Sequence, residues 1–172
     1  GGHNGRDETT TLTLIPMIKS KLSIPLIAAG GIATGQAIAA CMALGAEGFQ
    51  IGSRFVACIE SSAHNNFKNA VLKAKEGDTE LTLKELTPVR LLKNKFYNDI
   101  QTAYARLATS DDLKSLLGRA RAKKGMFEGD MNEGQLEIGQ VSSSIQEIKP
   151  AHEIVKEIME DFHKTISKLQ RI

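Results

Sequence analysis

Two glycine-rich turns, each following a short apolar run, are the stretches of this chain best suited to binding a ligand. Gly30 and Gly31 follow the first run, and Gly52 and Ser53 follow the second. Glycine lets the backbone approach a ligand closely, and the N–H groups at the start of a helix bind anions. One such turn alone is more often only a tight connection. Two of them, on neighbouring strands, predict a phosphate site.

His3 is the residue best suited to acid–base chemistry. It stands in the glycine-rich loop GGHNG at residues 1–5, so its imidazole is not packed into a helix face. A histidine on the same rim as two phosphate turns can act as a general base near neutral pH. From the chain alone, an exposed histidine in a terminal loop is the more ordinary interpretation, and both remain open.

Other residue types offer less. Arg54, Lys68 and Arg90 could bind anions, although each is more ordinarily a surface charge. The sequence contains no nucleophile–base–acid arrangement. Its two cysteines, Cys41 and Cys58, form neither a CxxC motif nor a metal-binding spacing. The sequence therefore predicts no metal site.

A repeated strand–turn–helix pattern positions the two turns. Residues 24–29 are continuously apolar, which is typical of a strand buried on both faces. An uncharged helix is expected from Ala37 to Leu44, ended by Gly45 in the left-handed conformation. Residues 49–51 form the next short strand. Such units build parallel sheets, which place ligands at the carboxyl ends of their strands.

The remaining pattern predicts further helices and one pair of strands. Helices are expected at 11–21, after a cap at Ser62, around 96–107, from a cap at 110–112 through to Gly125, and from Pro150 onward. Strands are expected at 79–86 and 89–92. Residues 125–140 contain four glycines and many acidic residues, which predicts a surface loop.

Composition limits the class of protein. The chain has 172 residues, 41% of them hydrophobic, with 22 basic and 20 acidic side chains. This balance does not favour nucleic acid or an anionic membrane as a partner. No apolar run approaches the ~20 residues of a membrane helix, and the first residues are not a signal peptide. We therefore expect a cytoplasmic protein.

Four motifs together resemble one family. They are GGHNG at 1–5, AAGGIATG at 28–35, ALGAEGFQIGSRF at 43–55 and VRLLKN at 89–94. In this order and spacing they resemble the nitronate monooxygenase (2-nitropropane dioxygenase-like) family, which includes the flavin-dependent enoyl-acyl-carrier-protein reductases. The resemblance extends over nearly the whole chain. It implies an α/β protein in which FMN is bound by a TIM (β/α)8 barrel with a smaller, mainly helical lid domain.

By this resemblance the chain is the C-terminal part of such a barrel and supplies its strands 7 and 8. Residues 1–76 would belong to the barrel, 77–149 to the lid, and 150–172 to a terminal helix that packs back on the barrel. His3 matches the catalytic histidine of the family. The positions that match the FMN phosphate site are Gly30 and Gly31 on one side, and Gln50, Ile51, Gly52 and Ser53 on the other. Many relatives have Thr where this chain has Ser53, and the hydroxyl is kept.

The function that the resemblance implies is FMN-dependent oxidation of alkyl nitronates, with His3 as base for nitroalkanes or as anchor for the nitronate anion. One alternative is an FMN-dependent NAD(P)H enoyl-acyl-carrier-protein reductase acting on an enoyl thioester. An alternative of another class is a non-catalytic barrel fragment that completes a partner polypeptide. Strands 1 to 6 are absent from this sequence. We therefore expect the N-terminal part of the same protein, or a homo-oligomer partner, to complete the barrel.

Overall fold

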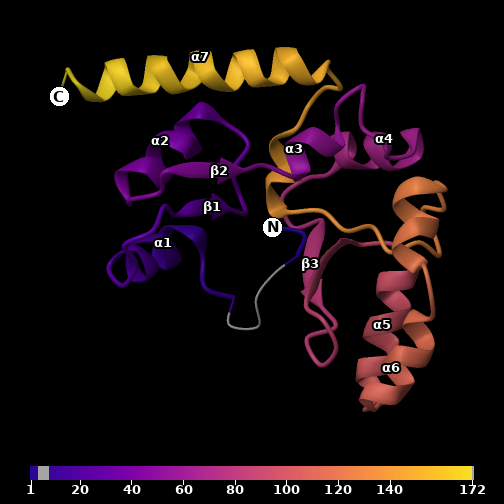
Figure 1. The fold of residues 1–172 in the computed structure, drawn as a ribbon. Coiled ribbons are helices and arrows are strands. Elements are labelled where there is room, and N and C mark those ends of the chain that lie inside the picture. The colour runs from indigo at the N-terminus through magenta and orange to yellow at the C-terminus, as the bar shows by residue number, and fades with distance from the viewer. Residues whose placement is uncertain (4–7, 172) are drawn as a thin grey trace.

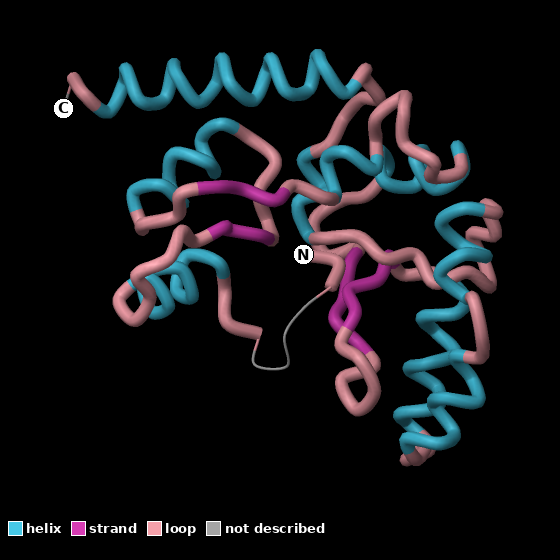
Figure 2. Tube along the Cα trace, in the orientation of Figure 1, coloured by secondary structure: helices cyan, strands magenta, loops and turns pink. Residues whose placement is uncertain are grey.

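The computed structural model describes residues 1–3 and 8–171, so Asn4 and Gly5 of the first motif lie outside the described residues. The described elements, in chain order, are α1 (Thr11–Lys19), β1 (Ile27–Ala29), α2 (Gly35–Ala43), β2 (Gly48–Gln50), α3 (Ser53–Val56), α4 (Asn65–Lys73), β3 (Thr79–Thr82), β4 (Val89–Leu92), α5 (Lys95–Ala105), α6 (Ser110–Leu117), the π-helical turn η1 (Lys123–Phe127), the 3₁₀ helix η2 (Gln140–Ser144) and α7 (Ala151–Leu169). Figure 2 shows how short the strands are beside the helices and loops.

The first two strands form the predicted parallel pair. Ile27 is opposite Gly48, and Ala29 is opposite Gln50. Helix α2 connects the strands (Figure 1), and α1 contacts both α2 and β1. As predicted, α2 ends at a left-handed glycine, Gly45, whose φ is +106°. The mixed α/β character of the fold is therefore confirmed.

The expectation that residues 24–29 form a strand buried on both faces is wrong. Only Ile27–Ala29 is a strand, and it alternates in exposure: Ala28 is buried, whereas Ile27 is 56% exposed. Ala28 belongs to the core cluster that includes Ile15 of α1 and Ile38 of α2. The helices cover one face of the strand pair. The other face, which carries Ile27, stays open within the described residues.

β3 and β4 form the second sheet, the pair of strands predicted from the sequence, and their pairing is antiparallel. β4 has further partners on its other edge. Leu92 N–H donates to Leu136 O at 2.9 Å, Ile138 N–H donates to Arg90 O at 3.1 Å, and Arg90 N–H donates to Gly2 O at 2.7 Å. The strand thus holds both the first residues of the chain and residues 136–138.

The prediction of a surface loop at 125–140 is therefore wrong. Gly125, Gly134 and Gly139 are buried, as are Leu136 and Ile138. Gly125 and Gly134 lie so close that a Cβ on Gly134 would stand 2.1 Å from the Cα of Gly125. These glycines permit close packing of backbone on backbone, and do not mark an exposed connection.

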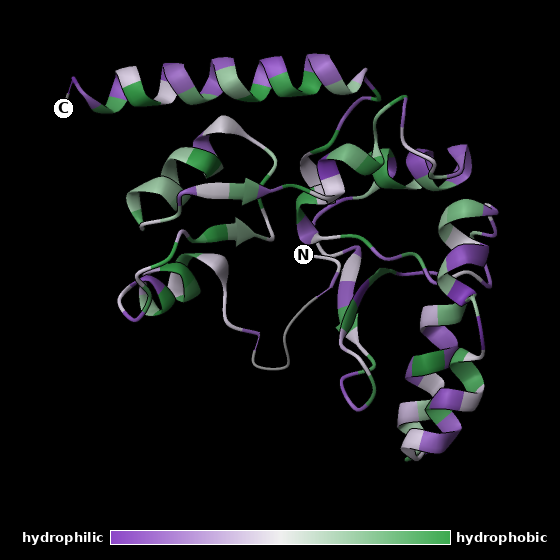
Figure 3. Cartoon of the chain, viewed as in Figure 1, coloured by the Kyte–Doolittle hydropathy of each residue, from purple (hydrophilic) through white to green (hydrophobic). Residues whose placement is uncertain are grey.

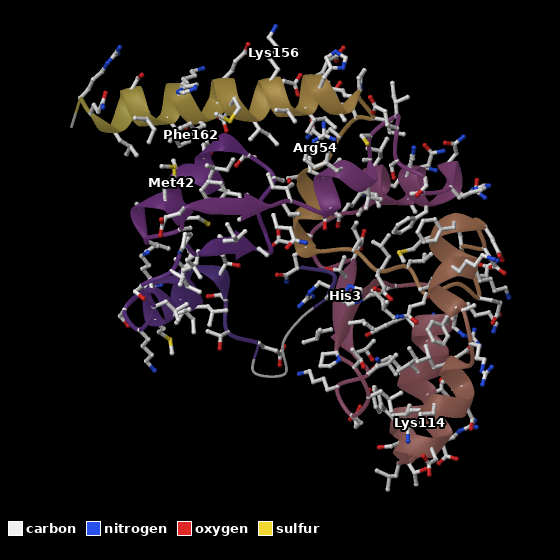
Figure 4. All side chains as sticks on the ribbon, in the orientation of Figure 1. His3, Met42, Arg54, Lys114, Lys156 and Phe162 are labelled. Atoms are coloured by element: carbon white, nitrogen blue, oxygen red, sulfur yellow. The ribbon has the colours of Figure 1, made fainter. Side chains whose placement is uncertain are left out.

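Helix α7 packs back on α2, where the sequence predicted a terminal amphipathic helix. Ile154 and Ile158 are buried in the same core cluster as Ala28. Phe162 points from α7 toward α2 (Figure 4), and hydrophilic and hydrophobic bands alternate along the helix (Figure 3). Gly35 makes the approach possible, because a Cβ there would lie 2.0 Å from the backbone N of Phe162.

Several predicted helix ends differ from the observed ones. The cap of α4 is His64, whose Nδ1 accepts from Asn66 N–H at 3.1 Å, and not Ser62. The cap of α6 is Thr109, which forms a capping box with Asp112. That helix ends at Leu117, well before Gly125. At both helix starts, the side chain that accepts from the first N–H groups is a neighbour of the predicted cap.

In Figure 1 the elements form two halves, with the N-terminus between them. One half contains α1, β1, α2, β2 and α7, and the other contains the β3–β4 hairpin with α5 and α6. A separate core cluster is built around Phe67 and Val71 of α4 together with Leu136 and Ile138, and it includes Leu92 of β4. The division into a barrel part, a lid and a terminal helix remains a prediction.

Candidate functional site

The two glycine turns lie side by side because β1 and β2 end in register. Ala29 is the partner of Gln50, so Gly30 and Ile51 begin the two turns at the same level. Gly30 has a φ of +104° and Gly31 a φ of +72°, conformations that side-chain-bearing residues rarely adopt. The hydroxyl of Thr11 donates to the Gly30 carbonyl at 2.9 Å, which ties the first turn to the start of α1.

Both turns leave room for a bound group. A Cβ placed on Gly31 or on Gly52 would meet no atom within 4 Å. Two glycines on adjacent turns, each facing open space, are the kind of cradle that a phosphate occupies. The residues present therefore fit a phosphate-bearing cofactor.

The start of α2 is not part of this cradle, contrary to the expectation that its N–H groups face the ligand. Thr34 Oγ1 accepts from Ala37 N–H at 3.1 Å, and Asp161 of α7 accepts from Gln36 N–H at 3.0 Å. Protein side chains thus occupy two of the first N–H groups of α2. Asp161 also places a negative charge at this helix start, where the helix dipole favours it.

The second turn is joined to a distant segment. Gly139 N–H donates to Ser53 Oγ at 3.0 Å, so the hydroxyl that the resemblance assigns to the phosphate already has a protein partner. Gln50 is exposed, and Ile51 packs against the core cluster of β1. A Cβ on Gly139 would lie 3.2 Å from the Cα of Gly1, which itself lies beside Gly30. Close backbone contacts therefore connect the two turns.

His3 lies next to β4, paired with Val89 in an isolated bridge. Its imidazole is exposed (Figure 4), and Nε2 is 3.2 Å from Oε2 of Glu137. The Glu137 side chain is only 9% exposed, and burial raises the pKa of its carboxyl above the usual range, although the charge of His3 acts in the opposite direction. A histidine with a shielded carboxylate partner is an arrangement suited to proton transfer.

A cleft of about 700 Å³ opens beside the first turn. Its lining comes from three places: Gly30 and Gly31 in the turn after β1, Ala37 and Cys41 on α2, and Arg90 on β4. Gln140, which follows Gly139, also reaches it. His3 and the residues of the second turn are not among the described residues that line this cleft. The structure thus brings the two turns together and leaves His3 to one side, toward β4.

Two of the three candidate cations are buried, which corrects their interpretation as surface charges. Arg54 donates from Nη1 to the Ala57 and Glu147 carbonyls, at 3.4 and 3.3 Å. Lys68 Nζ donates to the Cys58 carbonyl at 2.7 Å. Main-chain oxygens compensate the burial of both groups, so these cations stabilise the 57–59 segment and do not reach a ligand.

Two further features concern the described residues as a whole. No group of three or more His, Cys, Asp or Glu side chains in residues 1–3 and 8–171 is arranged to hold a metal ion. Within the same residues, no helix combines the length and the apolar character that crossing a membrane requires.

Sequence reasoning missed Glu137 and Gly139. Both lie in the stretch that the glycine and acid content assigned to a surface loop. The alternation of Leu136 and Ile138 with polar neighbours was the available signal, because that pattern is typical of a half-buried strand. In so short a segment, the alternation alone does not establish a strand, and the pairing with β4 becomes visible only in the folded chain.

Comparison with known proteins shows the family of this chain. The family model for nitronate monooxygenase matches residues 1–161. A protein of Staphylococcus saprophyticus named "Probable nitronate monooxygenase" is 34% identical over 139 residues, which cover 73% of this chain and 39% of that protein.

Two solved structures share the fold. FabK of Thermotoga maritima superposes with a TM-score of 0.88 at 36% identity, over 99% of this chain and 53% of that one. The nitroalkane oxidase of Streptomyces ansochromogenes superposes with a TM-score of 0.77 at 31% identity, over 98% of this chain and 50% of that one. This chain spans about half the length of the relatives it matches. With a family model that matches all but its last 11 residues, the chain belongs to the nitronate monooxygenase family.

Proposed function

We propose that this chain is part of an FMN-dependent oxidoreductase that oxidises alkyl nitronates. One observation carries the proposal. The two glycine turns follow paired positions of the parallel strands β1 and β2, and there is open space at Gly31 in the first turn and at Gly52 in the second. Family membership adds the reaction type, since the matching model is that of nitronate monooxygenases.

The FMN phosphate would be held by Gly30 and Gly31 on one side and by Gln50, Ile51, Gly52 and Ser53 on the other. Open space at Gly31 and Gly52 lets an anion reach the backbone at both turns. Ser53 is held in place by the Gly139 N–H, so it would act with its hydroxyl already oriented. FMN, when bound, supplies the electron-transfer chemistry that no side chain of this chain provides.

His3 would handle the proton or the charge of the substrate. A nitroalkane must lose a proton from the carbon that carries the nitro group, and an exposed imidazole beside a carboxylate can accept it. A nitronate arrives already deprotonated, and a protonated His3 would then attract the anion.

A second enzymatic function is supported by one specific comparison. FabK of Thermotoga maritima gives a TM-score of 0.88 with this chain. By analogy, the alternative is an NAD(P)H-dependent enoyl-acyl-carrier-protein reductase, in which His3 would position or protonate the enoyl thioester. The alternative without catalysis is a barrel fragment that completes a partner polypeptide.

Assays on the complete protein separate these functions. Turnover of an alkyl nitronate with oxygen supports the proposal. Reduction of a crotonyl thioester by NADH, without nitronate turnover, supports the reductase. Absence of both activities from a flavin-loaded protein would favour the non-catalytic alternative.

His3→Ala tests the role of the histidine in the same assays. We expect a rate loss of ~10²–10⁴-fold, typical of removing a general base. The melting temperature should stay within a few degrees because the side chain is 77% exposed. His152→Ala is the matched control: that side chain is 78% exposed and also lies near a glutamate. A large stability loss with full turnover in His3→Ala would contradict the assignment.

A further inference from the structure

Glu137 is held beside His3 by more than one restraint. Its Oε1 accepts from the buried Gln135 Nε2 at 2.6 Å, while Oε2 faces His3 Nε2 at 3.2 Å. Its backbone is paired with Leu91 of β4. Each carboxylate oxygen therefore has its own partner, and the carboxylate has little freedom to turn away.

The same strand positions the histidine. His3 is paired with Val89, and Arg90 N–H donates to Gly2 O at 2.7 Å. β4 thus aligns residues 1–3 and residues 136–138 along one edge. The contact between the imidazole and the carboxylate follows from this shared alignment, although 134 positions separate the two residues in the sequence.

We propose that Glu137 is a positioning residue for His3, one that orients the imidazole through Nε2 and stabilises its protonated form. The inference rests on the proposed function, in which His3 accepts a substrate proton. Glu137 touches neither the reacting atoms nor the cofactor and acts only through the histidine.

The contact determines which nitrogen does the chemistry. His3 Nε2 lies 3.2 Å from Glu137 Oε2. In the proposed arrangement a neutral His3 keeps its proton on Nε2, facing the carboxylate, and carries its lone pair on Nδ1. When a nitroalkane is deprotonated, the C–H bond breaks and a new N–H bond forms at Nδ1. The electron pair of the C–H bond stays on the substrate and is delocalised into the nitro group, which gives the nitronate. Glu137 remains a carboxylate throughout and balances the imidazolium that forms.

The burial of the carboxylate makes this balance stronger. Burial reduces the screening of the Glu137 charge by water, so the carboxylate attracts an imidazolium 3.2 Å away more strongly than it would at an exposed site. Among the described residues, the charged groups along this edge of β4 include Glu137, the α-amino group of Gly1 and Arg90, whose Nη1 donates to the Thr79 carbonyl at 3.3 Å. Arg90 is unchanged in the variants below, so their comparison isolates the carboxylate.

Glu137→Gln in the complete, flavin-loaded enzyme tests the proposal, with a nitroalkane and its pre-formed nitronate as the two substrates. We expect kcat for the nitroalkane to fall about 10–10²-fold, because the imidazolium loses its partner, and kcat for the nitronate to stay within about twofold. Glu137→Asp should recover part of the rate. Glu128→Gln, at an exposed glutamate paired with Lys123, is the control and should match the wild type.

A double-variant cycle shows whether Glu137 acts through the histidine. In the His3→Ala background, Glu137→Gln should cause no further loss, because the group it positions is gone. The inference would be overturned if the ratio of kcat for the nitroalkane to kcat for the nitronate were the same in the wild type and in Glu137→Gln. A further loss of kcat on adding Glu137→Gln to His3→Ala would also overturn it. A wild-type enzyme that oxidises the nitronate but never deprotonates the nitroalkane would also overturn it. A wild type inactive on the nitronate would instead refute the proposed function.

Discussion

Gly31 meets two separate requirements, and each alone would favour glycine. Its φ of +72° lies in the left-handed region, where a Cβ costs roughly 1–2 kcal/mol. The position also faces open space, so a side chain there would project into the volume assigned to the phosphate. A variant at this position combines backbone strain with obstruction of the site, and a control is needed to separate them.

Gly31→Val should release flavin from the complete protein, measured as lost flavin absorbance after gel filtration. The matched control is Gly77→Val. Gly77 has a φ of +83° and also faces open space, but it lies in the connection between α4 and β3. Both variants should lose similar stability, by roughly 1–2 kcal/mol or somewhat more for a β-branched residue. Equal flavin retention in the two variants would count against the phosphate site at Gly31.

At the scale of elements, the contact between α2 and α7 shows how one small residue sets a packing distance. A Cβ on Gly35 would lie 2.0 Å from Phe162 N and 2.4 Å from Ile158 O, both backbone atoms that cannot turn aside. Asp161, on the same turn of α7, accepts from Gln36 N–H. Close approach and helix capping therefore depend on each other at this crossing.

Gly35→Ala should weaken this crossing although alanine is the better helix former. The helices must move apart, which separates Asp161 from Gln36 N–H and loosens Ile158 in the core. We expect the free energy of unfolding of the complete protein, measured by urea denaturation, to fall by about 1–3 kcal/mol or more. Gly52→Ala, whose Cβ would meet no atom within 4 Å and whose φ is −102°, should change stability much less. A Gly35→Ala variant as stable as the wild type would contradict the tight crossing.

At the scale of the whole molecule, the open face of the strand pair is the main feature. Several large apolar side chains around α1 and β1 are exposed: Leu12, Leu14, Met17, Leu22, Ile24 and Ile27. Within the described residues, β1 and β2 are paired only with each other. Exposed apolar surface and unpaired strand edges both favour association with further chain. We propose that upstream residues of the same protein, or a second polypeptide, cover this face.

Residues 1–172 expressed alone should therefore hold no stoichiometric FMN and should not unfold cooperatively. Burying each large apolar side chain contributes roughly 1.5–3 kcal/mol, and the open face forgoes that contribution. Flavin absorbance and thermal unfolding, measured beside the complete protein, check this expectation. A monomer of these residues that binds one FMN and melts cooperatively would show that the additional chain is unnecessary.

Local features could be predicted from the sequence, because they depend on residues that are neighbours in the chain. The apolar runs, the glycine turns after them and the amphipathic pattern of α7 were all legible, and the parallel pairing of β1 with β2 followed from the connecting helix. The family was legible too, since its motifs are contiguous stretches.

Contacts between residues far apart in the sequence could not be predicted and became visible in the folded chain. The pairing of residues 136–138 with β4 turned an expected loop into a buried segment and brought Glu137 to His3. Tertiary packing also brings the Gly139 N–H to the Ser53 hydroxyl, and the Asp161 carboxylate to the Gln36 N–H at the start of α2. Arg54 and Lys68 are buried for a related reason: carbonyl oxygens from nearby turns and, for Arg54, from Glu147 surround them. Such contacts depend on the register of a strand and the distance between two helices, which no spacing along the chain encodes.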